Sequence, residues 1–175
     1  PEARTVRQPE PVEGGIAPIH GYLLNAGFAH DVREWHSRHP EVPLSFFWDR
    51  PDEYVDETLS FHSLDDKAFL EGLAGCRAYA STAGFESVCE AMYLGKPLLM
   101  VPSHIEQKCN AFDATNYGRP LDGSRTDGPR PACTSDHFDL DLLTEFAANQ
   151  YEPDPDFRMW ADSADRIFLE ELTSF

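Results

Sequence analysis

The feature that most constrains the fold is the alternation of short apolar runs with longer segments of helical periodicity. Five runs have the length and composition of strands: 19–25, 42–49, 57–62, 77–81 and 96–101. Between them the apolar residues recur at helical spacing, as do Phe28, Val32 and Trp35. Strands separated by helices of about ten to fifteen residues predict right-handed βαβ units. We therefore expect an α/β protein with a doubly wound parallel sheet, in the strand order 3-2-1-4-5.

The sequence predicts one Rossmann-like domain with a short lead-in. Residues 1–18 hold four prolines and two adjacent glycines and are typical of a linker, whereas 19–175 predict a single domain. Residues 119–131 are rich in glycine and proline, so we expect an exposed loop. The chain begins at Pro1 without an initiator Met, and we expect it to be an excerpt of a longer protein.

Charge and cysteine usage narrow the function classes. Asp and Glu number 31 against 14 Lys and Arg, without a basic cluster, which argues against nucleic-acid binding. The four cysteines are scattered and form no CxxC pair, so we expect a reduced, cytoplasmic chain without a metal site. His36 and His39 are three residues apart, and we interpret them as a solvated helix end before Pro40.

Two strand–helix turns stand where the predicted strand order reverses, which is where such sheets bind ligands. One turn is Asn25-Ala26-Gly27, and the other runs from Ser81 through Thr82 and Ala83 to Gly84. Glycine lets a ligand approach the backbone closely. The helix that starts near Gly84 would offer free N–H groups to a phosphate. Alternatively, Gly84 only eases helix–strand packing.

Side chains that follow the second turn could contact a sugar or nucleotide. Glu90 lies one helical turn beyond Ser87, where a carboxylate suits two vicinal hydroxyls, although it could equally be a surface glutamate. Ser103 and Glu106 have the spacing of a capping box, as do Ser63 and Asp66.

Gln107 follows Glu106 at the mouth of the fifth strand. We expect it to have no capping role, so that its amide is available to hydroxyl groups of a ligand.

These residues together carry a family resemblance. The stretch AGFESVCEAMYLGKPLLMVPSHIEQKCNA resembles the C-terminal donor-binding domain of GT-B glycosyltransferases, the superfamily of MurG-like and UDP-glycosyltransferase enzymes. The positions that agree with the superfamily pattern are Gly84, Ser87, Glu90, Gly95, Pro97, Pro102, Glu106, Gln107, Asn110 and Ala111.

The resemblance implies roles for individual residues in binding a nucleotide-sugar, with UDP as the expected nucleotide. Gly84 and Ser87 would meet the diphosphate and Glu90 the ribose, while Glu106 and Gln107 would meet the transferred sugar. The remaining donor-binding positions implied are Asn25, Gly27, His62, Ser63, Thr82 and Ala83, with His62 and Ser63 beside the base. Thr82 stands where plant-type enzymes have histidine. No cofactor or metal is implied.

The resemblance also implies that this chain is one half of a GT-B fold. The acceptor and the general base would be held by an N-terminal domain or a separate subunit, through which the enzyme could associate peripherally with a membrane. Two other readings keep the fold: one half of a sugar-nucleotide epimerase, or a non-catalytic interaction module. The acidic surface and the amphipathic C-terminal segment are compatible with the last.

Overall fold

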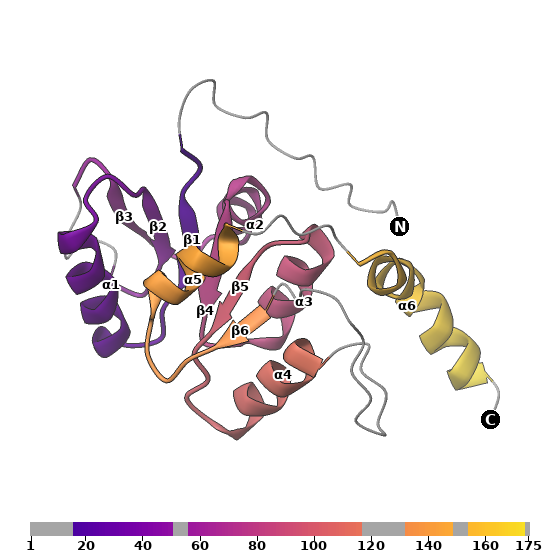
Figure 1. Ribbon diagram of the computed structural model, residues 1–175. Coiled ribbons are helices and arrows are strands. Elements are labelled where there is room, and N and C mark those ends of the chain that lie inside the picture. Colours follow the sequence, from indigo (N-terminus) through magenta and orange to yellow (C-terminus); the bar gives the residue numbers. More distant parts are fainter. Residues whose placement is uncertain (1–15, 51–55, 117–131, 149–153, 174–175) are drawn as a thin grey trace.

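The computed structural model describes residues 16–50, 56–116, 132–148 and 154–173 (Figure 1). The expected loop 119–131 and most of the expected lead-in 1–18 lie outside these residues. The described part is an α/β domain around one parallel sheet.

The sheet has six parallel strands in the order β3-β2-β1-β4-β5-β6, which confirms the predicted order and extends it by one strand. The strands are β1 (Ile19–Tyr22), β2 (Leu44–Phe47), β3 (Leu59–His62), β4 (Ala78–Ser81), β5 (Leu98–Met100) and β6 (Ala132–Thr134). The sequence did not predict β6, because a three-residue strand after a long polar segment has no periodicity of its own.

Helices cover both faces of the sheet, as a doubly wound fold requires (Figure 1). One face packs against α1 (Ala26–Arg38) and α5 (Leu140–Ala147), and the other against α2 (Asp66–Gly75), α3 (Phe85–Leu94) and α4 (Ile105–Asn116). Alternate strand residues supply the two cores: Ala78 and Ala80 face the first, whereas Tyr79 faces the second.

The centre of the sheet leaves no room for a side chain at Gly21 of β1. A Cβ there would lie 2.1 Å from the Phe46 ring and 2.6 Å from the Ala80 carbonyl oxygen. Glycine at this position therefore lets the middle strands and the aromatic core on the α1 side come together.

The last helix, α6 (Pro155–Thr173), extends away from the sheet and contacts α3 (Figure 1). The Arg158 guanidinium donates to the Tyr93 carbonyl oxygen at 2.6 Å, and the Tyr93 hydroxyl donates to Asp162 at 2.9 Å. Within the described ranges, no helix combines the length and apolar character needed to cross a membrane.

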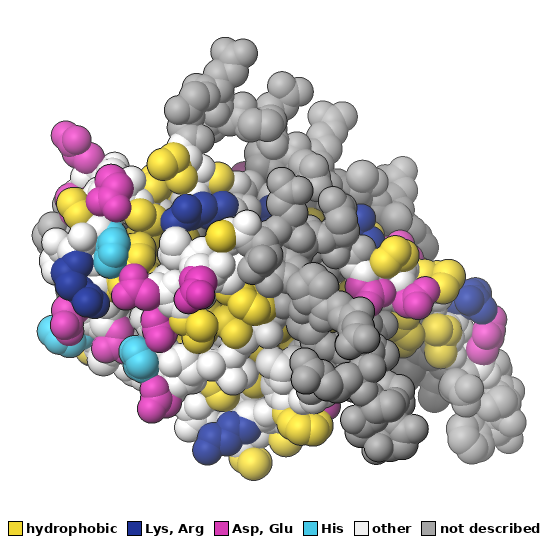
Figure 2. Space-filling view, in the orientation of Figure 1, with side chains coloured by type: hydrophobic (Ala, Val, Ile, Leu, Met, Phe, Trp, Pro, Cys, Tyr) yellow, Lys and Arg dark blue, Asp and Glu magenta, His cyan; other side chains and the backbone are white. Residues whose placement is uncertain are grey.

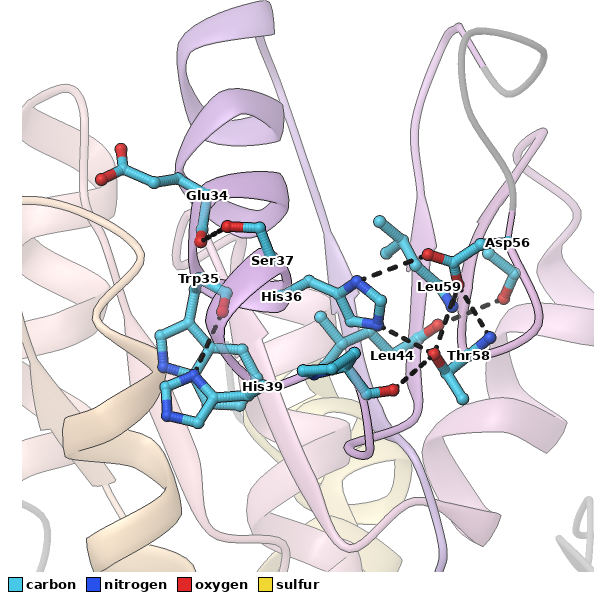
Figure 3. A network of polar contacts seen from close by, with 11 residues as sticks. Glu34, Trp35, His36, Ser37, His39, Leu44, Asp56, Thr58 and Leu59 are labelled. Atoms are coloured by element: carbon cyan, nitrogen blue, oxygen red, sulfur yellow. Dashed lines mark hydrogen bonds and ion pairs between the residues drawn. The ribbon is translucent and has the colours of Figure 1, made fainter.

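A buried histidine ties the end of α1 to the edge strand β3 (Figure 3). His36 Nε2 lies 3.0 Å from Thr58 Oγ1, and Nδ1 lies 3.6 Å from Asp56 Oδ2. Thr58 Oγ1 in turn donates to the Pro40 carbonyl oxygen at 2.8 Å. The interpretation of His36 as part of a solvated helix end is therefore wrong: its ring is buried because the loop before β3 folds back onto it.

Acidic side chains dominate the charge on the face shown in Figure 2. Among the described residues visible there, Asp and Glu lie over α1 and α5, and Lys and Arg occur in separate places. This distribution shows no concentrated basic patch on the described part of that face, in keeping with the excess of carboxylates in the sequence.

Candidate functional site

A pocket of about 660 Å³ opens at the carboxyl ends of β1 and β4, between α2 and α3. This is the point where the strand order reverses. Its volume is typical of sites for small ligands, which occupy about 300–1,000 Å³. It is lined by Tyr22, Leu24, Leu64, Asp66, Phe69, Leu70, Tyr79, Thr82, Gly84, Phe85, Glu86, Ser87, Glu90 and Gln107.

The turn between β4 and α3 presents an uncapped helix start to this pocket. Gly84 is the N-cap of α3 and has no side chain to bond the first N–H groups. The residue before it, Ala83, has a left-handed φ of 63° and is fully buried. Ser81 Oγ accepts from the Ala83 N–H at 3.2 Å, and Asn110 Nδ2 donates to the Ala83 carbonyl oxygen at 2.9 Å. These two bonds hold the backbone in a conformation that alanine rarely adopts.

Hydroxyl groups lie around the start of α3. Ser87 donates to the Gly84 carbonyl oxygen at 3.2 Å, and Thr82 lies buried in the turn. Both side chains line the pocket, as does the Gly84 backbone. A Cβ at Gly84 would meet only Ser87 Oγ, at 3.7 Å, so the free protein has space at this position that a ligand can use.

Three carboxylates also line the pocket: Asp66 from α2, and Glu86 and Glu90 from α3. Burial, together with the nearby charges of Glu86 and Asp66, raises the pKa of the Glu90 carboxyl. Glu90 makes no hydrogen bond or ion pair with the described residues, and no lysine, arginine or histidine is among the lining residues. Within the part of the chain that the structure describes, the pocket therefore offers an anionic ligand only neutral donors.

Gln107 caps the start of α4, a role that was not predicted from the sequence. Its Oε1 accepts both the Ser103 N–H and the Ser103 hydroxyl, each at 2.8 Å, at the start of α4. The expectation that Gln107 has no capping role is therefore wrong, because the turn places Gln107 rather than Glu106 within reach of Ser103. Glu106 is exposed and instead accepts from Asn110 Nδ2 at 2.6 Å. Gln107 is buried and lines the pocket, whereas Glu106 does not.

The turn between β1 and α1 is closed by a side chain. Asn25 is the N-cap of α1, and its Oδ1 accepts the Phe28 N–H at 3.1 Å. Gly27 lies in the first turn of the same helix. Neither residue lines the pocket, although Leu24, which precedes the cap, does.

His62 and Ser63 lie at the end of β3 and are exposed. The His62 ring contacts Ser60 Oγ at 2.9 Å and Phe47, and neither His62 nor Ser63 lines the pocket. The predicted capping box at Ser63 is wrong: Asp65 is the N-cap of α2, and its carboxylate accepts the Ala68 N–H at 2.7 Å. A shift of two residues in the helix start thus turns Asp66 into a first-turn residue that lines the pocket.

Of the predicted donor-binding residues, the pocket brings together Thr82, Gly84, Ser87, Glu90 and Gln107. The pocket also includes residues that were not predicted from the sequence: Asp66 and its neighbours on α2, which form one wall, and Tyr79 on β4, which forms the floor. Glu86 could have been predicted as a pocket residue, because it lies between Gly84 and Ser87 in the motif that resembles GT-B enzymes. Within the described ranges, no group of three or more His, Cys, Asp or Glu side chains is arranged to hold a metal ion.

Comparison with known proteins bears directly on this site. Residues 45–128, just under half of the chain, match the model of glycosyl transferase family 1. This match includes β4, α3 and the uncapped turn between them. The chain resembles GT-B glycosyltransferases. That resemblance, expected from the motif around Gly84, is confirmed.

Solved structures of GT-B glycosyltransferases share the fold. The glycotransferase of kitacinnamycin aligns with a TM-score of 0.60 at 16% identity, over 85% of this chain and 39% of its own. The spinosyn forosaminyltransferase SpnP aligns with a TM-score of 0.55 at 15% identity, over 92% and 45%. UGT89C1 of Arabidopsis thaliana, complexed with UDP, aligns with a TM-score of 0.51 at 14% identity, over 77% and 35%.

The chain therefore spans less than half the length of each of these GT-B structures. A comparison with curated protein sequences gives no match.

Proposed function

We propose that this chain is the donor-binding half of a glycosyltransferase, which binds a nucleotide-sugar and transfers the sugar to an acceptor. The observation that carries the proposal is the uncapped start of α3, which opens into a pocket at the switch point of the sheet. The match of residues 45–128 to glycosyl transferase family 1 supports the reaction class. UDP is the proposed nucleotide, supported by the UDP in the Arabidopsis structure of the same fold.

The diphosphate would lie at the start of α3. The free N–H groups there carry the positive end of the helix dipole, which attracts phosphate without a basic side chain. Ser87 would add its hydroxyl, and the space above Gly84 would accept a phosphate oxygen. These donors would also stabilise the charge that develops on the diphosphate as it leaves the sugar.

Glu90 would accept hydrogen bonds from the two ribose hydroxyls. Glu90 is half-buried near the start of α3, where the diphosphate would lie. It has no hydrogen-bond partner among the described residues that a ribose would need to displace. This role favours the carboxylate form, since both oxygens of an ionised carboxylate are acceptors and neither carries a proton.

The sugar would lie near Gln107. The Gln107 carbonyl oxygen is committed to Ser103, so the amide nitrogen is the group left for a sugar hydroxyl. Glu106 would reach the sugar only by releasing Asn110. The uracil would lie toward the end of β3, close to His62 and Ser63. The turn that holds Asn25 and Gly27 would border the donor from the other side, with the Asn25 side chain kept at the cap of α1.

The acceptor and the base that deprotonates it would come from another domain or subunit. Each of the three similar structures is more than twice the length of its aligned part, which leaves room for such a domain in those proteins. In this scheme the present chain binds the donor and stabilises the leaving group, and the other half supplies general-base catalysis. An acceptor half of this kind could also mediate peripheral membrane association.

Calorimetric titration of the full-length protein with UDP and with a panel of UDP-sugars tests the proposal. We expect saturable UDP binding that persists in the presence of a chelator, and release of UDP during turnover with an acceptor. Gln107→Glu keeps an acceptor oxygen for Ser103 but removes the amide donor, so it should weaken UDP-sugar binding while leaving UDP affinity unchanged. Absence of any nucleotide binding by the wild-type protein would contradict the proposal. A sugar inverted at a ring carbon other than the anomeric one, formed without transfer to an acceptor, would indicate an epimerase.

A further inference from the structure

The floor of the pocket contains a buried hydroxyl without a partner. Tyr79, on the central strand β4, is fully buried (0% exposed) and lines the pocket. Its phenol oxygen makes no hydrogen bond within the part of the chain that the structure describes. Buried tyrosine hydroxyls nearly always have a partner, because an unpaired polar group loses its hydration without compensation.

The ring of Tyr79 is held firmly, so the hydroxyl cannot turn away from this position. The ring packs edge-on against Phe69 at 6.0 Å between centroids and stacks on His20 at 5.9 Å. Burial raises the pKa of the Tyr79 hydroxyl, and the nearby Ser87 and Ser81 side chains partly offset this effect. The phenol is therefore a neutral O–H donor that lies close to Ser87 and Ser81 but has no hydrogen bond of good geometry to either.

The two serines differ in whether a ligand in the pocket could change their hydrogen bonds. Ser81 accepts the Ala83 N–H, is buried, and does not line the pocket. Ser87 lines the pocket, and its own proton goes to the Gly84 carbonyl oxygen. Ser87 is thus the neighbour of Tyr79 whose hydroxyl would reorient when a ligand with acceptor oxygens arrives.

We propose that Tyr79 is a positioning residue for the nucleotide: when Ser87 donates its hydroxyl proton to a phosphate oxygen, Ser87 Oγ accepts the O–H of Tyr79. The serine then sits in a chain of two hydrogen bonds, in which each polarises the next and the Ser87 donor is strengthened. The proposal rests on the proposed function, because it takes the ligand to be a nucleoside diphosphate. The unpaired phenol of the free protein becomes paired only in the complex.

The test compares Tyr79→Phe with wild type in the full-length protein, with UDP and uridine as the probes. We expect Tyr79→Phe to weaken UDP binding by about fivefold to tenfold, the size of one neutral hydrogen bond, and to leave uridine affinity unchanged. The thermal midpoint of the ligand-free variant should stay the same or rise, because the substitution removes an unpaired buried hydroxyl. Tyr93→Phe is the matched control: it removes a hydroxyl of α3 that bonds Asp162 outside the pocket, and it should not change UDP affinity.

A double-mutant cycle shows whether Tyr79 acts through Ser87. In a Ser87→Ala background, Tyr79→Phe should cause no further loss of UDP affinity. Equal UDP affinity of Tyr79→Phe and wild type would overturn the inference while leaving the proposed function intact. A clearly lowered thermal midpoint without ligand, or an additive loss in the double variant, would also overturn it. Failure of wild type to bind UDP would remove the proposed function, and this inference with it.

Discussion

Two strand–helix turns flank the switch point of the sheet, and they end in opposite ways. After β1, the side chain of Asn25 bonds the Phe28 N–H and closes the start of α1. After β4, Gly84 stands at the same position of α3 and leaves the first N–H groups without a side-chain cap. The pocket lies along the second helix start, and Asn25 is not among its lining residues.

The two helices also differ in their second turn. Asp31 and Glu90 both lie six residues after their N-caps. The Asp31 carboxylate accepts the Phe138 N–H at 3.4 Å, whereas Glu90 faces the pocket without a partner among the described residues. A helix start becomes available to a ligand when its polar groups are not already satisfied within the protein.

The largest expected effect on UDP binding comes from giving the turn after β4 an asparagine cap like that of the turn after β1. Gly84→Asn supplies a side-chain cap that would occupy an N–H group and fill the phosphate seat. We expect UDP binding to weaken by about 3 kcal/mol, the loss of two charge-assisted hydrogen bonds. The thermal midpoint should change little, because asparagine and glycine differ by only a few tenths of a kcal/mol as N-caps. If calorimetry finds undiminished UDP affinity, the diphosphate does not bind at the start of α3.

The second prediction concerns the different contributions of Glu90 and Asp31 to nucleotide binding. Glu90→Gln should lose about 1–3 kcal/mol of nucleotide binding, as for a charge-assisted bond, and should no longer discriminate against deoxyribose analogues. Asp31→Asn is the matched control and should leave nucleotide affinity unchanged. If calorimetry finds the same affinity in Glu90→Gln and wild type, Glu90 has no ribose contact.

Glu90 should also affect how stability depends on pH. Its folded-state pKa is raised, so the folded protein binds this proton more tightly than the unfolded chain does. The resulting contribution to stability is present at low pH and is lost as pH rises from the unfolded pKa through the folded one. Above that window, Glu90→Gln should therefore be more stable than wild type, and chemical denaturation at several pH values would reveal it.

The third prediction removes the cap of the first turn. Asn25→Ala should cost about 1 kcal/mol of stability, as for other N-cap deletions, and Asn25→Ser should restore most of it. Because the Asn25 side chain already caps α1, we expect UDP affinity to stay the same in both variants. A loss of UDP binding in Asn25→Ala that Asn25→Ser does not rescue would show that the Asn25 side chain itself contacts the donor.

The smallest expected effect concerns ionic strength. Among the described residues, Asp66, Glu86 and Glu90 line the pocket and no basic side chain does, so these charges repel a diphosphate. Salt screens this repulsion. UDP affinity should therefore rise by a few-fold, or stay constant, between about 0.01 and 0.15 M salt, where the Debye length falls from about 30 to 8 Å. A steep fall in affinity over the same range would indicate that unrecognised cations hold the phosphate.

Local sequence patterns determined the sheet and the central motif of the site. Five of the six strands and the helix start at Gly84 follow from apolar runs, helical spacing and glycine placement. These features are set by interactions between residues close together in the chain, which is why a sequence displays them. The strand order was expected because it is common among doubly wound sheets. The resemblance around Gly84, Ser87 and Glu90 comes from the same short stretch.

Tertiary structure decided which side chains cap the helices and which ones meet in the pocket. Asp65 rather than Ser63 starts α2, two residues later than predicted. Gln107 rather than Glu106 reaches Ser103, because one residue along a helix moves a side chain to another face. Strand β6 exists only because β5 offers it a partner edge. Asp66 and Tyr79 stand on different elements from Glu90, and only the packing of α2 and α3 over β4 brings their carboxylates and hydroxyl to one cavity.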